Sequence, residues 1–315
     1  MVSAVGWVLV MVVGTGAIVW GAELFAEHLA SASSRLGVSS FALALLLAGA
    51  EPEELATVVT ASASGVDGVA FGDVIGANAA IATVAVGLGA LVAPIPFGAR
   101  VRRYGLGGLV AAVAAGVIIW DGHVGRLEGG VLVAGYVAFV AAIWVRERRP
   151  PALGETAELE EADSNSGRVG RELVLVVAGV AALTAGSVAL VEGVRRLSGV
   201  ESTQTRLGLV VVGFATAFEL VVLAWSASRR GISDAVVAGV VGSYAYNVTM
   251  SLGVGALAAP IAIADAGTIR APFLVMVGLM VVVLVLSARD DVLTAAHGRL
   301  LVLGYPLFVA VALLS

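Results

Sequence analysis

The sequence predicts an all-α integral membrane protein with ten transmembrane helices, arranged as two inverted five-helix repeats with broken helices at an ion site. Three observations predict this fold class. The 315-residue chain is 59% hydrophobic and only 13% charged, whereas soluble domains carry about 25% charged residues. It contains ten apolar segments near the roughly 20 residues that a helix needs to cross a bilayer. Acidic residues interrupt two of these segments at equivalent places.

The ten apolar segments are separated by short polar turns and by one long polar stretch. From the N-terminus they are 4–32, 38–63, 68–93, 104–121, 129–146, 171–197, 204–228, 233–259, 268–288 and 297–314. Several are longer than a straight span requires, which indicates tilted or broken helices. Only three residues precede the first segment, too few for the charged start of a signal peptide, so we expect a retained helix.

The long polar stretch divides the chain into two halves of five helices. It begins with R-E-R-R-P-P and continues with an acidic run, E-T-A-E-L-E-E-A-D. Such composition is typical of a solvated tether. We therefore predict a first repeat over 1–146, a linker over 147–170 and a second repeat over 171–315.

The stretch Leu47–Leu55, L-A-G-A-E-P-E-E-L, places three carboxylates around a proline inside an apolar segment. A carboxylate at membrane depth costs about 2.5–3.5 kcal/mol on insertion scales. Proline removes a backbone donor and breaks a helix. Transporters build cation sites near the bilayer midplane from broken helices and buried acids. The stretch therefore predicts such a site.

A second acidic stretch, G-F-A-T-A-F-E-L, lies 166 positions further on and carries Glu219 where the first carries Glu53. The same offset relates four glycines and a Pro-Ile pair. These are Gly65 to Gly231, Gly76 to Gly242, Gly87 to Gly253, Gly89 to Gly255, and Pro94-Ile95 to Pro260-Ile261. Such matches predict two homologous halves, each with one buried glutamate.

Arginine counting predicts the orientation in a cell membrane. With the N-terminus outside, the outer loops hold five of the 18 basic residues, which leaves 13 for the cytoplasmic side. The outer five are Arg126, Arg195, Arg196, Arg206 and Arg270. We therefore expect a plasma-membrane protein with both termini outside and the linker inside. An odd number of helices in each half then makes the repeat an inverted one.

The second half offers a group of hard oxygen donors around its glutamate. Thr216 and Glu219 are i,i+3 and are expected to share a helix face. Ser243 and Asn247 are i,i+4 and share a face of the next helix. Carboxylate, hydroxyl and amide oxygens suit sodium or calcium. We predict that these four residues bind the cation.

The first half keeps fewer neutral donors. Ala50, Ala77 and Ile81 stand where the second half has Thr216, Ser243 and Asn247. Asn78 is offset by one position and reaches the site only if its helix is rotated or unwound there. Asp73 is either a site residue or a capping aspartate near a helix start. We include Asn78 and Asp73 among the predicted metal ligands, with Glu53.

For the remaining acids and for the histidines, the sequence predicts a position relative to the membrane rather than a role as a ligand. Glu51 and Glu54 are expected to point away from the face of Glu53, toward an access path or interfacial water. Glu23, Glu27 and Glu192 either face a water path or lie at the membrane interface. His28, like the other two histidines, is expected near an interface.

The motifs themselves resemble a known family. The first repeat reads A-G-A-E-P-E and then G-D-V-I-G-A-N-A-A-I; the second reads F-A-T-A-F-E and then A-G-V-V-G-S-Y-A-Y-N. Both resemble the alpha repeats of the sodium/calcium exchanger (cation/calcium antiporter) superfamily, and the resemblance covers essentially the whole chain. It implies that Glu53 and Glu219 bind the transported cation. It also implies that helices one and six slide past the central bundle to switch sides.

The predicted function is secondary antiport of calcium, or another divalent cation, against sodium or protons by alternating access. The alternative is a non-transporting membrane scaffold or regulatory subunit with a degenerate ion site. The chain has no cysteine, which excludes disulfides and thiolate chemistry, and no motif indicates an enzyme. We expect no cofactor, no nucleic acid and no obligatory protein partner; the transported ions and the lipid bilayer are the expected partners.

The counter-ion is left open between sodium and protons. Several sodium ions need several oxygen cages, and the first half lacks three neutral donors. Protons need only a carboxylate whose pKa is raised by burial. The missing ligands therefore favour fewer sodium ions than a symmetric relative would bind, or coupling to protons.

Overall fold

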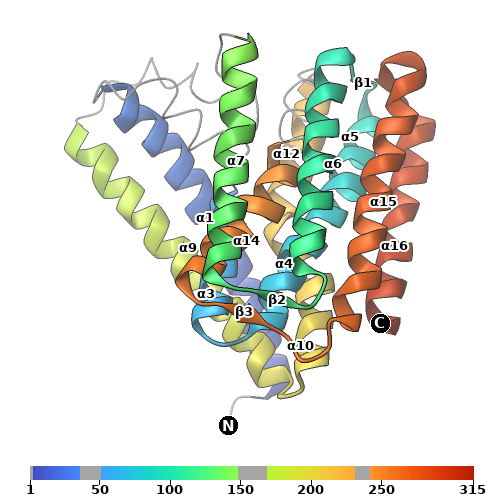
Figure 1. Ribbon diagram of the computed structural model, residues 1–315. Helices are drawn as coiled ribbons and strands as arrows, with labels where there is room; N and C mark the ends of the chain where they lie inside the picture. Colours follow the sequence, from blue (N-terminus) through green and yellow to red (C-terminus); the bar gives the residue numbers. More distant parts are fainter. Residues whose placement is uncertain (1–2, 36–50, 148–168, 231–241) are drawn as a thin grey trace.

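The computed structural model describes residues 3–35, 51–147, 169–230 and 242–315, and Figure 1 shows their arrangement. The described chain is almost entirely helical, with helices standing side by side. Both termini lie at one end of the molecule, and the ends that flank the central linker lie at the other (Figure 1). Ala50, most of the linker and parts of the segments 38–63 and 233–259 lie outside the described residues.

The described part of the first half consists of α-helices, one π-helical turn and two short strands. They are α1 (Ala4–Arg35), α3 (Pro52–Ala63), α4 (Asp67–Ala80), the π-helical turn η1 (Ile81–Ala85), α5 (Val86–Val92), β1 (Ile95–Pro96), α6 (Ala99–Ile119), β2 (His123–Val124) and α7 (Arg126–Glu147). The segment expected at 68–93 is thus one stack of α4, η1 and α5.

The second half follows the same order. Its elements are α9 (Val169–Leu197), α10 (Glu201–Leu207), η4 (Gly208–Val212), α11 (Gly213–Thr216), α12 (Phe218–Arg230), η5 (Asn247–Ser251), α14 (Leu252–Ala258), β3 (Ile261–Ala262), α15 (Gly267–Asp290), β4 (Val292–Leu293) and α16 (Ala295–Leu314). The segment expected at 204–228 is not one regular helix, since a π-helical turn and a break at Ala217 divide it.

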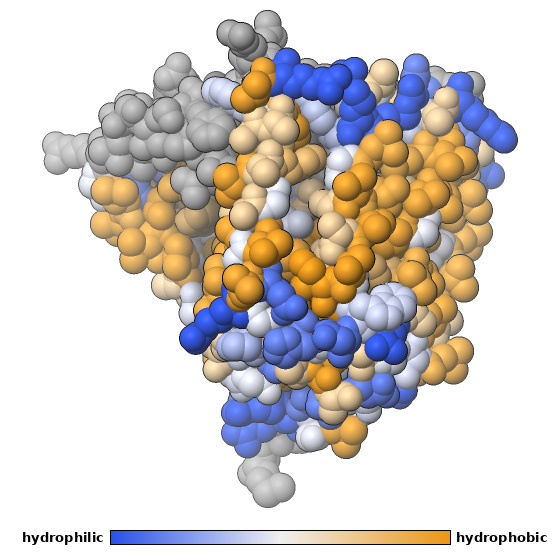
Figure 2. Space-filling model, viewed as in Figure 1, coloured by the Kyte–Doolittle hydropathy of each residue, from blue (hydrophilic) through white to orange (hydrophobic). Residues whose placement is uncertain are grey.

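Eight helical stretches in the described part of the chain are long and apolar enough to cross a membrane. Figure 2 shows a band of apolar side chains between two polar ends. The stretch Asp67–Val92 is the most deeply buried of the eight. The molecule is therefore a multi-pass membrane protein with one stack of helices at its centre.

Short elements of the first half recur in the second half at the 166-residue offset seen in the sequence. The turn η1 begins at Ile81 and η5 begins at Asn247, 166 positions later. Helices α5 and α14, and strands β1 and β3, keep the same offset. A π-helical turn adds one residue to a helical turn and re-aims the side chains around it. The two halves therefore carry the same irregularity at the same place.

Two antiparallel strand pairs connect the halves. Strand β1 pairs with β4, with Ile95 opposite Leu293. Strand β2 pairs with β3, with Val124 opposite Ile261. The pair β2–β3 lies at the end that carries the termini, and β1 lies at the opposite end (Figure 1). Each pair takes one strand from each half, so the halves are joined at both ends.

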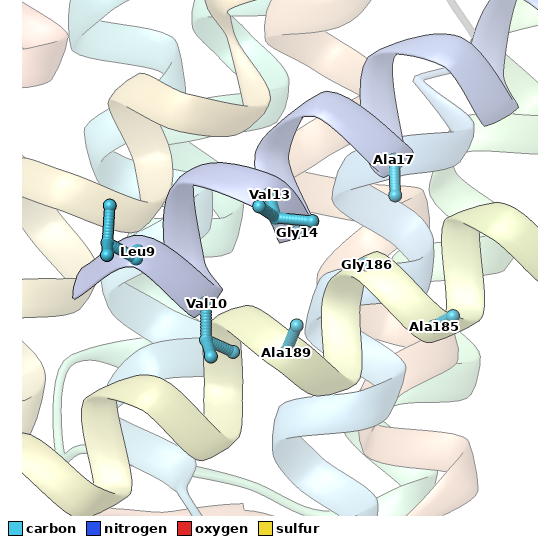
Figure 3. Close-up of a pocket in the computed structure, with 8 residues that line it drawn as sticks. All are labelled: Leu9, Val10, Val13, Gly14, Ala17, Ala185, Gly186 and Ala189. Carbon is cyan, nitrogen blue, oxygen red and sulfur yellow. The ribbon is translucent and has the colours of Figure 1, made fainter. Parts of the chain in front are cut away.

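Helices α1 and α9 pack closely along their length because glycines face each other. A Cβ atom at Gly186 would lie 2.5 Å from the carbonyl oxygen of Gly14. A Cβ atom at Gly21 would lie 2.9 Å from the carbonyl oxygen of Gly179. Small residues of this kind let membrane helices approach closely. Figure 3 shows the apolar groove of about 380 Å³ beside the Gly14–Gly186 contact.

Polar contacts connect α1 and α9 near both ends. Nδ1 of His28 lies 2.6 Å from Oε2 of Glu172, and both residues are buried. At the other end the guanidinium of Arg196 lies over the ring of Trp7, 5.6 Å from its centroid. His28 therefore forms a buried contact between two helices, and its position near a membrane interface stays a prediction.

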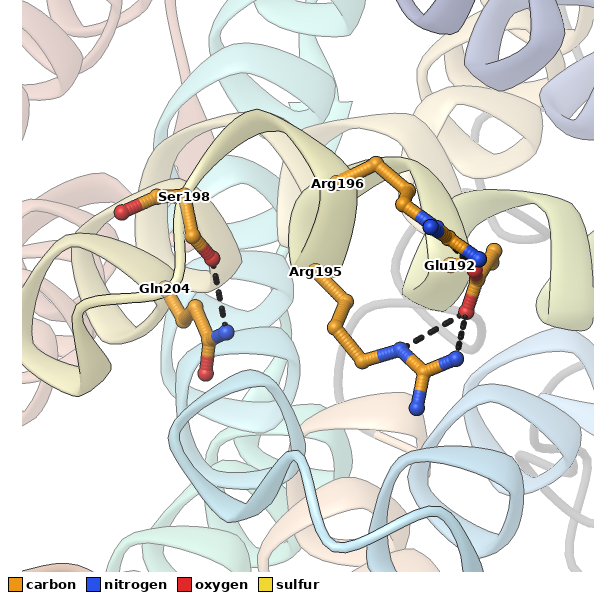
Figure 4. A network of polar contacts seen from close by, with 5 residues as sticks. All are labelled: Glu192, Arg195, Arg196, Ser198 and Gln204. Atoms are coloured by element: carbon orange, nitrogen blue, oxygen red, sulfur yellow. Dashed lines mark hydrogen bonds and ion pairs between the residues drawn. The ribbon is translucent and has the colours of Figure 1, made fainter. Parts of the chain in front are cut away.

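Glu192 belongs to an ion-pair network at the end of α9. Its carboxylate accepts hydrogen bonds from Nε of Arg195 at 2.8 Å and from Nε of Arg196 at 2.6 Å, and Gln204 donates to the carbonyl oxygen of Ser198 nearby (Figure 4). Exposed ion pairs of this kind are typical of a polar membrane boundary. The network favours an interfacial place for Glu192.

Candidate functional site

The site is built around the start of α3, where the sequence has the acidic stretch. Pro52 occupies the first helical position, where its missing N–H removes no hydrogen bond of the helix. Glu53 and Glu54 fall in the first turn, and Glu51 is the residue that precedes the helix. The partial positive charge of a helix N-terminus stabilises carboxylates there. The local sequence therefore concentrates negative charge at one buried helix end.

The three carboxylates of Glu51, Glu53 and Glu54 converge. One oxygen from each lies within 4.8 Å of the others, and the residues are 4%, 2% and 0% exposed. The expectation that Glu51 and Glu54 point away from Glu53 toward interfacial water is wrong. Helical spacing does not apply to Glu51, since its φ of −110° and ψ of 84° lie outside the helical region.

Two hydroxyls predicted in the second half bind carboxylates of the first half. The Oγ of Ser243 donates a hydrogen bond to Oε1 of Glu51. The Oγ1 of Thr216 donates to Oδ1 of Asp73 over 2.8 Å. Asp73 is fully buried in the middle of α4, so its interpretation as a helix cap is wrong. The structure thus brings Ser243, Thr216 and Asp73 into one polar centre with the glutamates.

Asn78 and Asn247 meet at the same level of the bundle. Nδ2 of Asn247 donates to Oδ1 of Asn78 over 3.1 Å. Nδ2 of Asn78 donates to the carbonyl oxygen of Tyr244, also over 3.1 Å. Asn78 is therefore buried in the interior, although α4 is regular at this residue and the π-helical turn begins only at Ile81.

Glu219 occupies a different position from the other acids. It lies half-buried in the first turn of α12 and is not one of the three converging carboxylates. That Thr216 and Glu219 share one helix face stays a prediction, because a short break separates them. Helix α11 ends at Thr216 and α12 begins at Phe218, so the two residues stand on different helices.

Two tyrosines beside the carboxylates were missed by the sequence analysis. The rings of Tyr136 and Tyr246 pack edge to face with centroids 5.3 Å apart, and both residues are buried. Tyr246 lies within electrostatic reach of Glu51, Glu53 and Glu54. The sequence signal that could have identified Tyr246 was its position three residues after Ser243, on the same helical face.

Several buried oxygens of this centre have no hydrogen-bond donor among the described residues. They are both carboxylate oxygens of Glu54, Oε2 of Glu53, Oδ2 of Asp73 and Oδ1 of Asn247. Buried acceptors without a donor are costly, and buried charges require pairing or a cation. Carboxylate, hydroxyl and amide oxygens together are ligands for hard cations such as calcium and sodium. The arrangement is therefore suited to bind a cation inside the membrane.

The carboxylate centre is connected to the long tilted helices. The hydroxyls of Thr57 and Ser187 share a hydrogen bond of 3.1 Å between α3 and α9. Thr57 lies one turn after Glu53 and Glu54. A displacement of the pair α1–α9 along the bundle would therefore act directly on the helix that carries the carboxylates.

Comparison with known proteins places these features in context. The family model described as sodium/calcium exchanger protein matches residues 6–145 and 171–314. The putative antiporter CaxA of Alkalimonas amylolytica is 24% identical over 284 residues, covering 89% of both chains. The sodium/calcium exchanger MaX1 of Methanosarcina acetivorans is 33% identical over 89 residues, 28% of this chain and 25% of that protein.

The fold also matches a solved structure. The sodium-calcium exchanger NCX_Mj, soaked with 2.5 mM Na⁺ and 10 mM Sr²⁺, superposes with a TM-score of 0.61 at 20% sequence identity. The match covers 98% of this chain and 99% of that one. Both described halves therefore have the fold of a known membrane exchanger.

Proposed function

Since this chain belongs to the sodium/calcium exchanger family and is a cation antiporter rather than an enzyme, we propose that it exchanges calcium, or another divalent cation, for sodium or protons by alternating access. The observation that carries the proposal is the buried convergence of Glu51, Glu53 and Glu54 with hydroxyls from the opposite half. Several buried carboxylates stay ionised together only when positive charge compensates them. A divalent cation, sodium ions or protons supply that charge in turn.

Obligatory exchange follows if these occupants exclude one another. A charged centre without a compensating cation is too costly to move across the membrane, whereas a neutralised one can change sides. The contact between Thr57 on α3 and Ser187 on α9 supports a coupling of the carboxylates to the long helices. In the proposed cycle, α1 and α9 slide past the central stack and open it to one side at a time.

We assign the cation to Glu53 and, from the repeat alone, to Glu219, which is not one of the three converging carboxylates in this structure. Thr216, Ser243, Asn247, Asn78 and Asp73 are assigned as supporting oxygen ligands or as the groups that orient them. The transported ions are the ligands, and no cofactor is assigned. The loss of neutral donors at Ala77 and Ile81 in the first half favours proton coupling or a small number of sodium ions.

We infer ten spanning helices in two inverted repeats, 1–146 and 171–315, joined by a linker over 147–170. Reciprocal contacts support a two-fold relation between the halves. A Cβ at Gly129 would lie 2.7 Å from the carbonyl oxygen of Gly253, and one at Gly87 would lie 3.0 Å from that of Gly298. Gly87 and Gly253 are equivalent by the 166-residue offset, so each half contacts the other in the same way. The arrangement of the ends in Figure 1 is compatible with halves of opposite direction.

We further propose a plasma-membrane location with both termini outside, because cytoplasmic loops are enriched in basic residues. Five of the 18 basic residues fall in the outer loops of that topology. The lipid bilayer and the exchanged ions are the partners that this function requires.

Transport by purified protein in liposomes tests the function. Calcium-45 uptake is measured with a sodium gradient and, separately, with a pH gradient. We expect uptake by the native protein, and at most a few per cent of it with Glu53→Gln or Glu219→Gln, which remove a charge from the assigned site. Glu27→Gln, at an exposed position of α1, is the matched control and should retain uptake. Native rates in either site variant would overturn the assignment, and no flux of any cation by the native protein would support the scaffold alternative.

A further inference from the structure

We propose that Glu51 and Glu54 are direct ligands of the transported divalent cation and set its preference over sodium. This inference rests on the proposed function and adds two residues to its site. The motif comparison assigns a cation role to the glutamate after Pro52 and gives its two acidic neighbours none. The structure places all three carboxylates together.

The first argument is geometric. Oxygens that bind one calcium ion lie about 2.4 Å from it, so any two of them are at most about 4.8 Å apart. The oxygens of Glu51, Glu53 and Glu54 meet this limit pairwise, with all three residues buried. The spacing of the three carboxylates therefore meets the distance requirement for contact with a single cation.

A second and independent observation comes from groups outside the three glutamates. Asp73 is fully buried on α4, and its Oδ2 has no donor among the described residues. Asp73 lies within electrostatic reach of both Glu53 and Glu54. An additional buried carboxylate oxygen beside three others is stable only when a cation or a proton neutralises it. Since Thr216 already occupies its other oxygen, Oδ2 is the atom of Asp73 that remains for a ligand.

The third argument compares the halves. Ala217 and Leu220 stand at the positions equivalent to Glu51 and Glu54, so the second half has no matching charges. The first half in turn lacks the neutral oxygens that the second half retains at Ser243 and Asn247. The first half is thus richer in carboxylates and the second half is richer in neutral donors. Ser243 bridges the two sets by its hydrogen bond to Glu51.

This difference in carboxylates changes which ion is preferred. The attraction of a carboxylate for a cation scales with the charge of the cation, so each added carboxylate favours calcium over sodium. Neutral hydroxyl and amide ligands discriminate less between the two charges. A site with three carboxylates, and a fourth nearby, should therefore bind a divalent cation strongly and sodium weakly.

Equilibrium binding of calcium-45 to the purified full-length protein in detergent, with and without competing sodium, tests the inference. Glu51→Gln and Glu54→Gln should each weaken calcium binding roughly tenfold or more. Sodium competition should change less, so that the preference for calcium over sodium falls. Glu27→Gln is the matched control and should bind as the native protein does. Glu54→Asp keeps the charge and should retain part of the affinity.

The outcomes separate this inference from the proposed function. Native calcium affinity in both Glu51→Gln and Glu54→Gln, with binding lost in Glu53→Gln, would overturn the inference and leave the function intact. An equal loss of calcium and sodium binding would assign the two residues a structural role and would also overturn it. Absence of calcium binding by the native protein would refute both. If Glu54→Gln does not elute as a monodisperse species, Glu51→Gln and Glu54→Asp decide.

Discussion

The hydrogen bond between Thr216 and Asp73 connects α11 to α4 at the centre of the site, and its contribution can be measured. The two atoms are 2.8 Å apart and both residues are fully buried. A hydrogen bond to a charged group contributes about 1.5–3 kcal/mol, against about 0.5–1.5 kcal/mol for one between neutral groups. Thr216→Val removes the donor and keeps the shape. We expect it to lower the free energy of unfolding by about 1.5–3 kcal/mol.

The same substitution in an Asp73→Asn background shows how much of this contribution to the free energy of unfolding depends on the charge of Asp73. There the acceptor is neutral, so Thr216→Val should cost about 1 kcal/mol. Unfolding is followed by circular dichroism in mixed micelles titrated with a denaturing detergent. Thr216→Ser keeps the hydroxyl and serves as the control. Equal costs in the two backgrounds, within about 0.5 kcal/mol, would refute the expectation that this hydroxyl stabilises a charge on Asp73.

Two further predictions concern packing and orientation. Gly76→Ala should prevent stable folding, because its Cβ would lie 2.1 Å from the carbonyl oxygen of Leu209. Gly16→Ala is the control and should fold normally, since a Cβ there meets nothing within 4 Å. Equal thermal stability of the two variants would contradict the close contact of Gly76 with Leu209. A cysteine introduced at Ser164 in this cysteine-free chain should resist an impermeant thiol reagent added to intact cells, whereas full labelling from outside would reverse the proposed orientation.

Much of the fold could be predicted because membrane insertion imposes a strong one-dimensional signal. Segment boundaries such as 171–197 and 297–314 agree with α9 and α16 to within two or three residues. Apolar length alone determines such spans. The breaks were harder to place, since the π-helical turns η1 and η5 begin at Ile81 and Asn247 without proline or any other local marker.

The candidate site was only partly predictable. Thr216, Ser243, Asn78 and Asn247 were identified from residue type and the repeat, and the structure finds them buried and hydrogen-bonded. Their side-chain partners were not predictable, because those contacts cross from one half to the other. Ser243, for example, meets Glu51, 192 positions away, and no periodicity within a helix indicates such a pair.

The sequence by itself determined that this is a membrane protein with two related halves, a family and a set of buried oxygens. Those properties depend on composition and on matches along the chain. Only the tertiary structure decided that Glu51 and Glu54 join Glu53, and that Glu219 lies apart from that group. The physical reason is that Glu51 precedes α3 and that Ala217 separates α11 from α12. At these two breaks the direction of a side chain is set by the packing of α3, α4 and α11 and no longer by helical spacing.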